Sequence, residues 1–303
     1  MAKKTASKNP HFAKKEHKQH VTLQKQQEKT SGRHHRRKAE PTPPNLTLHP
    51  YLQELKNNKK LDMLYGLHAV EAALKNPARE IEAIIINPNA QGKVKELYEK
   101  LAQNTPHDFD LIEMERPYFD LLAGGDAVHQ SIIMFSQPLP IWEVEDLYEK
   151  PHAMVMMLDQ PSDPRNIGAI LRSCAAFGAD ALIVTDKNTP ESTPLMAKAA
   201  VGAMEYIPII RVTNLKNAVD KLKDNGFWFI GLDGHTETAI DDIEPAEKSV
   251  IIMGSEGDGL RRLTKESCDF LVKIPMEKQM ESLNMSVAAS IALYELRKKI
   301  QKP

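Results

Sequence analysis

Short apolar runs alternate with helical patterns from about residue 62 to the end of the chain. Ile81–Ile86 and Met154–Leu158 are the clearest such runs, and they are typical of buried strands. Val94–Leu101 and Leu215–Leu222 have apolar residues at helical spacing. Strands that alternate with helices in this way predict an α/β fold.

The first part of this pattern predicts a small α/β domain over residues 61–137. Pro138 and Pro140 mark a linker, residues 138–152, in which 142–148 is expected to be helical. His68 and His129 could contact a ligand, but packing at the end of an element is the simpler explanation for each. The expected strands are Met63–Tyr65, Ile81–Ile86, Phe109–Ile112 and Val128–Phe135, and the expected helices are Gly66–Leu74, Val94–Leu101 and Tyr118–Leu122.

The second part, residues 153–303, predicts a parallel sheet covered on both faces by helical crossovers. One helix carries the apolar residues Ile167 to Phe177 and ends at Gly178, and a last helix follows Ser282–Asn284. The other expected helices are 195–204 and 215–222, and the expected strands are 154–158, 181–184, 206–210, 227–232, 249–253 and 270–274.

Length and composition bound the class of protein. The 303 residues suffice for about two domains, and 41% hydrophobic with 27% charged residues suits a globular protein. No apolar run approaches the roughly 18 residues that span a bilayer, and the N-terminus lacks the apolar segment of a signal peptide. Cys174 and Cys268 form no metal-ligand pattern. A reducing, cytoplasmic location is therefore expected.

The net charge of −1 conceals a strong asymmetry. Residues 1–40 contain nine Lys and three Arg against three Glu, a net charge of +9, so the remainder carries −10. We expect residues 1–60 to be a disordered basic tail, because large apolar groups are scarce there. Such a tail attracts a polyanion through a salt-sensitive electrostatic term, although a merely solubilising tail would have the same composition.

Three polar loops follow predicted strands: Asn166–Arg172, Gly254–Gly257 and Ser282–Asn284. In a parallel sheet, all three lie at the carboxyl edge, where open α/β folds bind ligands. Each residue also has a simpler explanation, such as a surface charge for Arg172, a helix-start carboxylate for Glu256 and helix caps for Ser282 and Asn284. The candidate catalytic residues are Asn166, Arg172, Glu256, Ser282 and Asn284.

Several common chemistries find no support. Gly254–Gly259 has the pattern G-x-x-G-x-G, which differs from the G-x-G-x-x-G of dinucleotide folds. No G-x-x-x-x-G-K-[ST] occurs, so a nucleotide triphosphatase is not indicated. No G-x-S-x-G indicates a hydrolase.

The chain resembles the SpoU-type RNA 2′-O-ribose methyltransferases of the SPOUT superfamily over about residues 62–300. The three motifs that carry the resemblance are Asn166–Arg172 with Phe177-Gly178, Gly254–Gly257, and Ser282–Ala288. Tyr65–Val70 and Val128–Gln130 are also similar to the small L30e-like substrate-binding domain of the family.

The resemblance implies a C-terminal SPOUT domain with a trefoil knot, one of the rare exceptions to the no-knot rule, and a homodimer. It implies S-adenosyl-L-methionine as the cofactor. Lys278 and Met280 stand where the family usually has glycine and valine. A positive φ at position 278 would be strained with lysine. The implied cofactor-binding residues are Gly254, Gly257, Ile274, Met276, Leu283 and Asn284.

The implied activity is methylation of a ribose 2′-hydroxyl in RNA, with a guanosine of 23S ribosomal RNA as the expected target. The alternatives are a transfer RNA substrate and a non-catalytic RNA-binding or ribosome-assembly protein of the same fold. Arg172 would act either as the base or as an electrostatic clamp, since a guanidinium keeps its proton at neutral pH. Asn166 and Glu256 would hold the substrate and the loop, and Ser282 and Asn284 would fix the geometry of the cofactor and the active site.

Overall fold

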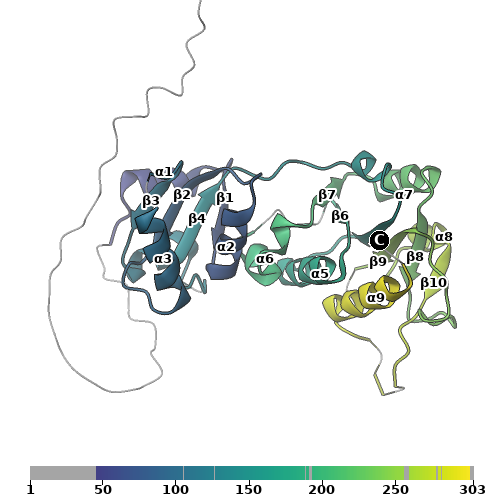
Figure 1. Cartoon of the computed structure of the whole chain (residues 1–303). Coiled ribbons are helices and arrows are strands. Elements are labelled where there is room, and N and C mark those ends of the chain that lie inside the picture. Colours follow the sequence, from purple (N-terminus) through teal and green to yellow (C-terminus); the bar gives the residue numbers. More distant parts are fainter. Residues whose placement is uncertain are drawn as a thin grey trace, which may run out of the picture.

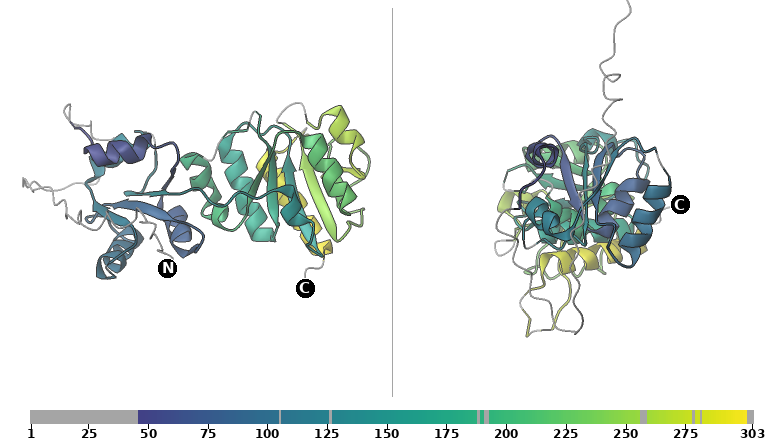
Figure 2. Two further views of the ribbon diagram at one scale, coloured as in Figure 1. Left: turned by 90° about the horizontal axis from the view of Figure 1, so that it is seen from above. Right: turned by 90° about the vertical axis from the view of Figure 1, so that its left-hand side faces the viewer.

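The computed structural model describes two β-sheets, each with its own helices (Figure 1). We call residues 46–137 the N-terminal unit and residues 153–300 the C-terminal unit. Figure 2 shows the two units side by side along the longer dimension of the molecule. The described residues are 46–104, 106–125, 127–187, 189–190, 193–255, 259–277, 279–280 and 282–300.

The N-terminal unit is built on a four-stranded sheet in the order β1-β4-β2-β3. Alternate residues of β2 face opposite sides, because side chains in a strand point up and down in turn. Ile84 and Ile86 pack with residues of α2 and α3, whereas Ala83 and Ile85 pack with residues of α1 and α4. The elements are α1 Pro50–Asn57, β1 Asp62–Tyr65, α2 Leu67–Lys75, β2 Ile81–Ile86, α3 Lys93–Gln103, β3 Asp110–Glu113, α4 Arg116–Ala123 and β4 Ile132–Ser136.

The C-terminal unit is a six-stranded, all-parallel sheet in the order β10-β8-β9-β5-β6-β7. The same alternation divides its core: Met154 and Met156 face α5 and α9, and Val155 and Met157 face α7. The elements are the 3-10 helix η2 Val144–Leu147, β5 Ala153–Leu158, α5 Pro164–Phe177, β6 Ala181–Thr185, α6 Pro194–Ala200, the 3-10 helix η3 Ala203–Glu205, β7 Ile209–Val212, α7 Leu215–Asp224, β8 Trp228–Leu232, β9 Lys248–Met253, α8 Arg262–Glu266, β10 Phe270–Val272 and α9 Met285–Lys299.

The parallel α/β architecture confirms the predicted fold class. Strand β10 lies beyond β8, so the last part of the sheet departs from the order of the chain. This order is compatible with the implied knot, whereas the knot itself, the L30e-like character and the domain boundaries stay predictions. Within the described residues, no helix is both long and apolar enough to cross a bilayer.

Some expected elements differ from the observed ones. Strand β4 begins at Ile132 rather than Val128, because Gln130 and Ser131 have φ of 53° and 61°, a left-handed conformation that a strand cannot contain. The expected helix 195–204 divides into α6 and η3, because Val201 and Gly202 also have positive φ.

The expected tail was too long. Residues 50–57 form α1, in which Leu52 and Leu55 are buried against Phe119 and Leu122 of α4. The residues of the expected tail that precede Leu46 lie outside the described part. The region 142–148 contains only the short helix η2, and α8 was not expected.

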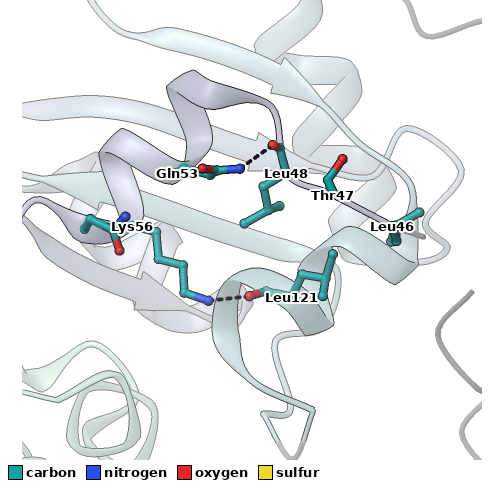
Figure 3. A pocket seen from close by; sticks show the side chains of 7 residues that line it. Leu46, Thr47, Leu48, Gln53, Lys56 and Leu121 are labelled. Carbon is teal, nitrogen blue, oxygen red and sulfur yellow. Dashed lines mark hydrogen bonds between the residues drawn. The ribbon is translucent and has the colours of Figure 1, made fainter. Parts of the chain in front are cut away.

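A small pocket lies between the beginning of α1 and α4 (Figure 3). Lys56 Nζ donates to the Leu121 carbonyl at 2.5 Å, and Gln53 Nε2 donates to the Leu48 carbonyl at 2.8 Å. The Lys56 bond joins α1 to α4, and the Gln53 bond holds the residues that lead into α1. The pocket belongs to the packing of α1 and lies away from the strand ends of the C-terminal unit.

Both cysteine thiols are expected to be unreactive. Burial raises the pKa of Cys174 to about 12 and that of Cys268 to about 12. A thiol with such a pKa is neutral near pH 7 and is a poor nucleophile and metal ligand. The described residues hold no cluster of three or more His, Cys, Asp or Glu that could bind a metal ion.

Shortening a buried side chain of α1 tests whether this helix belongs to the cooperative core. Leu55→Ala should lower the free energy of unfolding by ~2–5 kcal/mol, because it removes a side chain that is only 4% exposed. Glu54→Ala, on the exposed face of the same helix, should change it by less than about 0.5 kcal/mol. Urea denaturation measures both, and equal effects would show that α1 is not part of the cooperative core.

Candidate functional site

The loops after β5, β9 and β10 leave the C-terminal sheet at one edge. The strand register pairs Leu158 with Met253, and it pairs Val272 with Leu232. Strand β8 joins these pairs, because its Gly231 pairs with Ile252. The last residues of the four strands therefore lie in one row, and the three polar loops begin from it.

The beginnings of α5 and α9 touch at this edge. Asn284 caps α9 by accepting from the Ser286 backbone N–H at 2.9 Å, and it also accepts from Ser286 Oγ at 2.6 Å. Its amide Nδ2 donates to Asn166 Oδ1 at 3.3 Å. Asn166 stands in the first turn of α5, which Asp163 caps. Two predicted site residues, 118 positions apart, are thus in contact.

Small residues hold the two helices together farther along. Ser173 Oγ and Ser290 Oγ are 2.6 Å apart, and Ser290 Oγ also donates to the Ser286 carbonyl at 2.7 Å. Ala289 is fully buried beside this pair. Arg172 directly precedes Ser173 on α5. Its side chain is exposed, and it makes no ion pair or hydrogen bond with another described residue. Because its side chain is exposed, Arg172 can be reached by an external group.

The loop after β9 turns back sharply at Gly254. Ser255 forms an isolated bridge with Gly259, and the Gly259 N–H donates to the Ser255 carbonyl at 3.2 Å. A Cβ at Gly254 would lie 1.9 Å from the carbonyl carbon of Gly259, so only glycine fits. The predicted residues Glu256 and Gly257 lie outside the described part of the chain.

The loop after β10 presents apolar side chains that the chain itself only partly covers. Ile274 and Leu283 are half-buried, and Met276 is 40% exposed. Ser282 is exposed beside them. Lys278, the departure from the family pattern, lies outside the described residues. This edge therefore combines partly uncovered apolar groups with polar side chains at the beginnings of two helices.

Comparison with known proteins identifies the family. A model described as the SpoU rRNA Methylase family matches residues 153–294, and one described as RNA 2'-O ribose methyltransferase substrate binding matches residues 63–142. The 23S rRNA (guanosine-2'-O-)-methyltransferase RlmB of Pseudomonas putida is 36% identical over 242 residues, which are 78% of this chain and 96% of that protein. The chain belongs to the SpoU rRNA methylase family.

A second relative agrees with this SpoU assignment, and one solved structure has a similar fold. The protein of the same name from Vibrio vulnificus is 38% identical over 240 residues, which are 77% of this chain and 95% of that protein. The crystal structure of the SpoU methyltransferase AviRb from Streptomyces viridochromogenes, in complex with AdoMet, shares the fold. It matches with a TM-score of 0.69 at 21% identity, over 82% of this chain and 95% of that one.

The SpoU site also contains an ion pair that sequence reasoning missed. Asp159 directly follows β5 and is 2% exposed. Arg261 grips it with two hydrogen bonds, Nε to Oδ2 at 2.7 Å and Nη2 to Oδ1 at 2.8 Å, and Thr264 Oγ1 adds a bond at 3.3 Å. This fork fixes the exit of the Gly254–Leu260 loop over the end of β5. A carboxylate placed directly after a wholly apolar strand was the available signal.

Glycine substitution tests the tight turn. Gly254→Ala should destabilise the SpoU protein by ~1–3 kcal/mol or more, because the added Cβ meets backbone atoms. Gly234→Ala is a matched control, since nothing lies within 4 Å of the Cβ it adds. Thermal unfolding of both variants measures the difference. A Gly254→Ala protein as stable as the control would contradict the close approach of the loop.

Proposed function

We propose that this SpoU protein transfers a methyl group from S-adenosylmethionine to a ribose 2′-hydroxyl of RNA, at a guanosine of large-subunit ribosomal RNA. The contact between Asn166 and Asn284 is the observation that carries the proposal, with the exposed Arg172 farther along the same helix α5. It gathers polar groups from two distant motifs at a strand edge suited to ligands. The names of the Pseudomonas and Vibrio relatives support the substrate.

The residues at this edge fit the cofactor. A cofactor of this kind supplies an electrophilic methyl group on a sulfonium, next to an adenosine. Ile274, Met276 and Leu283 offer partly uncovered apolar surface for the base. The turn at Gly254 packs its backbone against that of Gly259, so Gly254 would serve the cofactor by shaping the loop after β9. Gly257 and Asn284 complete the proposed binding set.

Arg172 serves in this proposal as an electrostatic clamp. Its guanidinium retains its proton and presents donors in a fixed fork, which suits an RNA phosphate. It would hold the ribose so that the 2′-oxygen faces the methyl carbon. As the oxygen–carbon bond forms and the sulfur–carbon bond breaks, the hydroxyl proton leaves to phosphate or water. Asn166 and Glu256 would hold substrate and loop, and Ser282 and Asn284 would fix the geometry of the cofactor and the active site.

RNA is the substrate class because the acceptor hydroxyl distinguishes RNA from DNA. The family model that matches residues 63–142 is described as substrate binding, which supports the N-terminal unit as a second RNA-contacting domain. The +9 charge of residues 1–40 would add non-specific attraction to phosphates. Since ribosomal RNA is the target, we also place the protein in the cytoplasm.

A homodimer is the second part of the proposal. On α9, Val287 is 46% and Tyr294 50% exposed, and Ile291 is half-buried between them. These positions are four and three residues apart, so they form one apolar stripe on the helix. The opposite face of α9 already packs on α5 and the sheet. A second copy of the chain would cover the stripe next to the proposed active site.

Substitution of Arg172 tests whether this residue acts in methyl transfer rather than in cofactor binding. Arg172→Ala should lower the rate of RNA methylation at least about 100-fold, because the ribose would no longer be held in position by the clamp. Its affinity for S-adenosylmethionine, measured by calorimetry, should stay near that of the wild type. Arg262→Ala removes an exposed arginine that pairs with Glu266 of its own helix, and it should leave the rate nearly unchanged. Parallel loss of cofactor binding would mean that Arg172 is structural.

A charge in the apolar stripe tests the dimer. Val287→Asp should convert the protein to a monomer, because an unpaired carboxylate would be buried in the interface. Ile141→Asp is the control, since Ile141 is 87% exposed between the two units. Light scattering after size-exclusion chromatography gives the mass. A wild-type monomer, or a Val287→Asp dimer, would rule out this seam.

A further inference from the structure

The two units are joined by a buried ion pair. Arg79 lies between α2 and β2 of the N-terminal unit, and Glu205 ends η3 of the C-terminal unit. The Arg79 side chain is 0% exposed and that of Glu205 is 2% exposed. Arg79 Nη2 donates to Glu205 Oε1 at 2.7 Å and Nε donates to Oε2 at 3.2 Å. The planar guanidinium thus holds the carboxylate with both oxygens, which fixes direction as well as distance.

Arg79 and Glu205 each make further hydrogen bonds with neighbouring residues. Arg79 Nη1 donates to Asp62 Oδ2 at 2.9 Å and to the Gln137 carbonyl at 3.0 Å, both in its own unit. Asn76 Nδ2 donates to Glu205 Oε2 at 2.8 Å. Arg79 therefore faces two carboxylates, one from each unit. Opening the joint would leave Arg79 with Asp62 but would remove the arginine from the buried Glu205, which makes a partly open joint unfavourable.

The backbones also meet closely at this joint. Gly202 has φ of 86°, and a Cβ there would lie 2.5 Å from the Ala72 Cβ and 3.2 Å from the His68 carbonyl of α2. Apolar residues of both units belong to one continuous core cluster, which includes Val70 of α2 and Met204 of η3. The joint is a packed interface, in which α2 lies beside α6 (Figure 1).

Closely packed helices connect the joint to the proposed active site. Helix α6 leads into η3, and it presses on α5 so tightly that a Cβ at Gly168 would lie 2.5 Å from the Met196 carbonyl. Gly168 stands between Asn166 and Arg172 on α5. A displacement of the N-terminal unit would therefore act on the helix that carries the candidate catalytic residues.

We infer that Arg79 and Glu205 are positioning residues that set the span between the RNA-binding unit and the methyl-transfer site, and thereby select the nucleotide that is methylated. This inference rests on the proposed function. An RNA that docks on the N-terminal unit places only one ribose at Arg172 if the joint is fixed. A loose joint would let several riboses reach it, each for less of the time.

Two variants of the full-length protein loosen the joint in different ways. Glu205→Gln removes one charge and leaves the shape. Gly202→Ala keeps every charge and inserts a methyl group between the backbones. Gly124→Ala is the matched control, since Gly124 has φ of 91° but nothing lies within 4 Å of its added Cβ. The comparison with Gly124→Ala removes the cost of backbone strain from the result.

The measurements are site-mapped methylation of protein-free 23S rRNA, S-adenosylmethionine affinity, and small-angle X-ray scattering. Both joint variants should broaden the interdomain distances and lower kcat/KM at the wild-type nucleotide about tenfold, with methylation appearing at neighbouring riboses. Cofactor affinity should stay within about twofold of wild type, as should every property of Gly124→Ala. If Gly202→Ala fails to fold, Glu205→Gln carries the test.

Three results would overturn the inference. Unchanged scattering in the variants would mean that the ion pair does not hold the units. A broadened distribution with unchanged site selection would mean that their orientation does not choose the nucleotide. A parallel loss of cofactor affinity would mean that the residues only support the fold. Failure of the wild type to methylate any RNA would instead refute the proposed function, and the scattering result would still report on the joint.

Discussion

The in-register alignment of the parallel strands is the constraint on which the proposed site depends. Strand β5 lies between β9 and β6 and is fully buried along its length, with alternate residues committed to opposite helical layers. A shift of one residue would exchange those layers, so the burial of both faces enforces the register. The same register places the ends of β5, β8, β9 and β10 in one row. The register that packs the core is thus the same register that aligns the strand ends at the proposed site.

Helix α5 links the aligned strands to the neighbouring helices. It packs on α6 through Gly168 and on α9 through the Ser173–Ser290 contact. Small residues permit both approaches, because a larger side chain at either contact would separate the helices. Asn166 and Arg172 are carried on a helix that is supported on two sides, and rigid support of this kind suits groups that must be placed accurately.

The sequence was sufficient to predict the parallel sheet, nearly all of its strands, and the meeting of Asn166 with Asn284. Apolar runs and helix caps are local signals, and the sheet topology converts them into a shared edge. The pairing of the residues in the two long-range ion pairs was not predictable. Asp159 and Arg261 are 102 positions apart, and Arg79 and Glu205 are 126 apart. Each looks like an ordinary surface charge until the fold brings its partner to it. The helix α1 was missed because its two buried leucines lie in a polar stretch.

The two protonated thiols affect how the protein can be studied. Burial raises the pKa of both Cys174 and Cys268 to about 12, so both are thiols rather than thiolates at pH 7. Thiol-specific dyes react with the thiolate, so the native protein should remain almost unlabelled. A cysteine introduced on an exposed surface of each unit would then be the preferred target. Fluorophores could be attached in pairs without first removing the natural cysteines, and the core around Cys174 would stay intact.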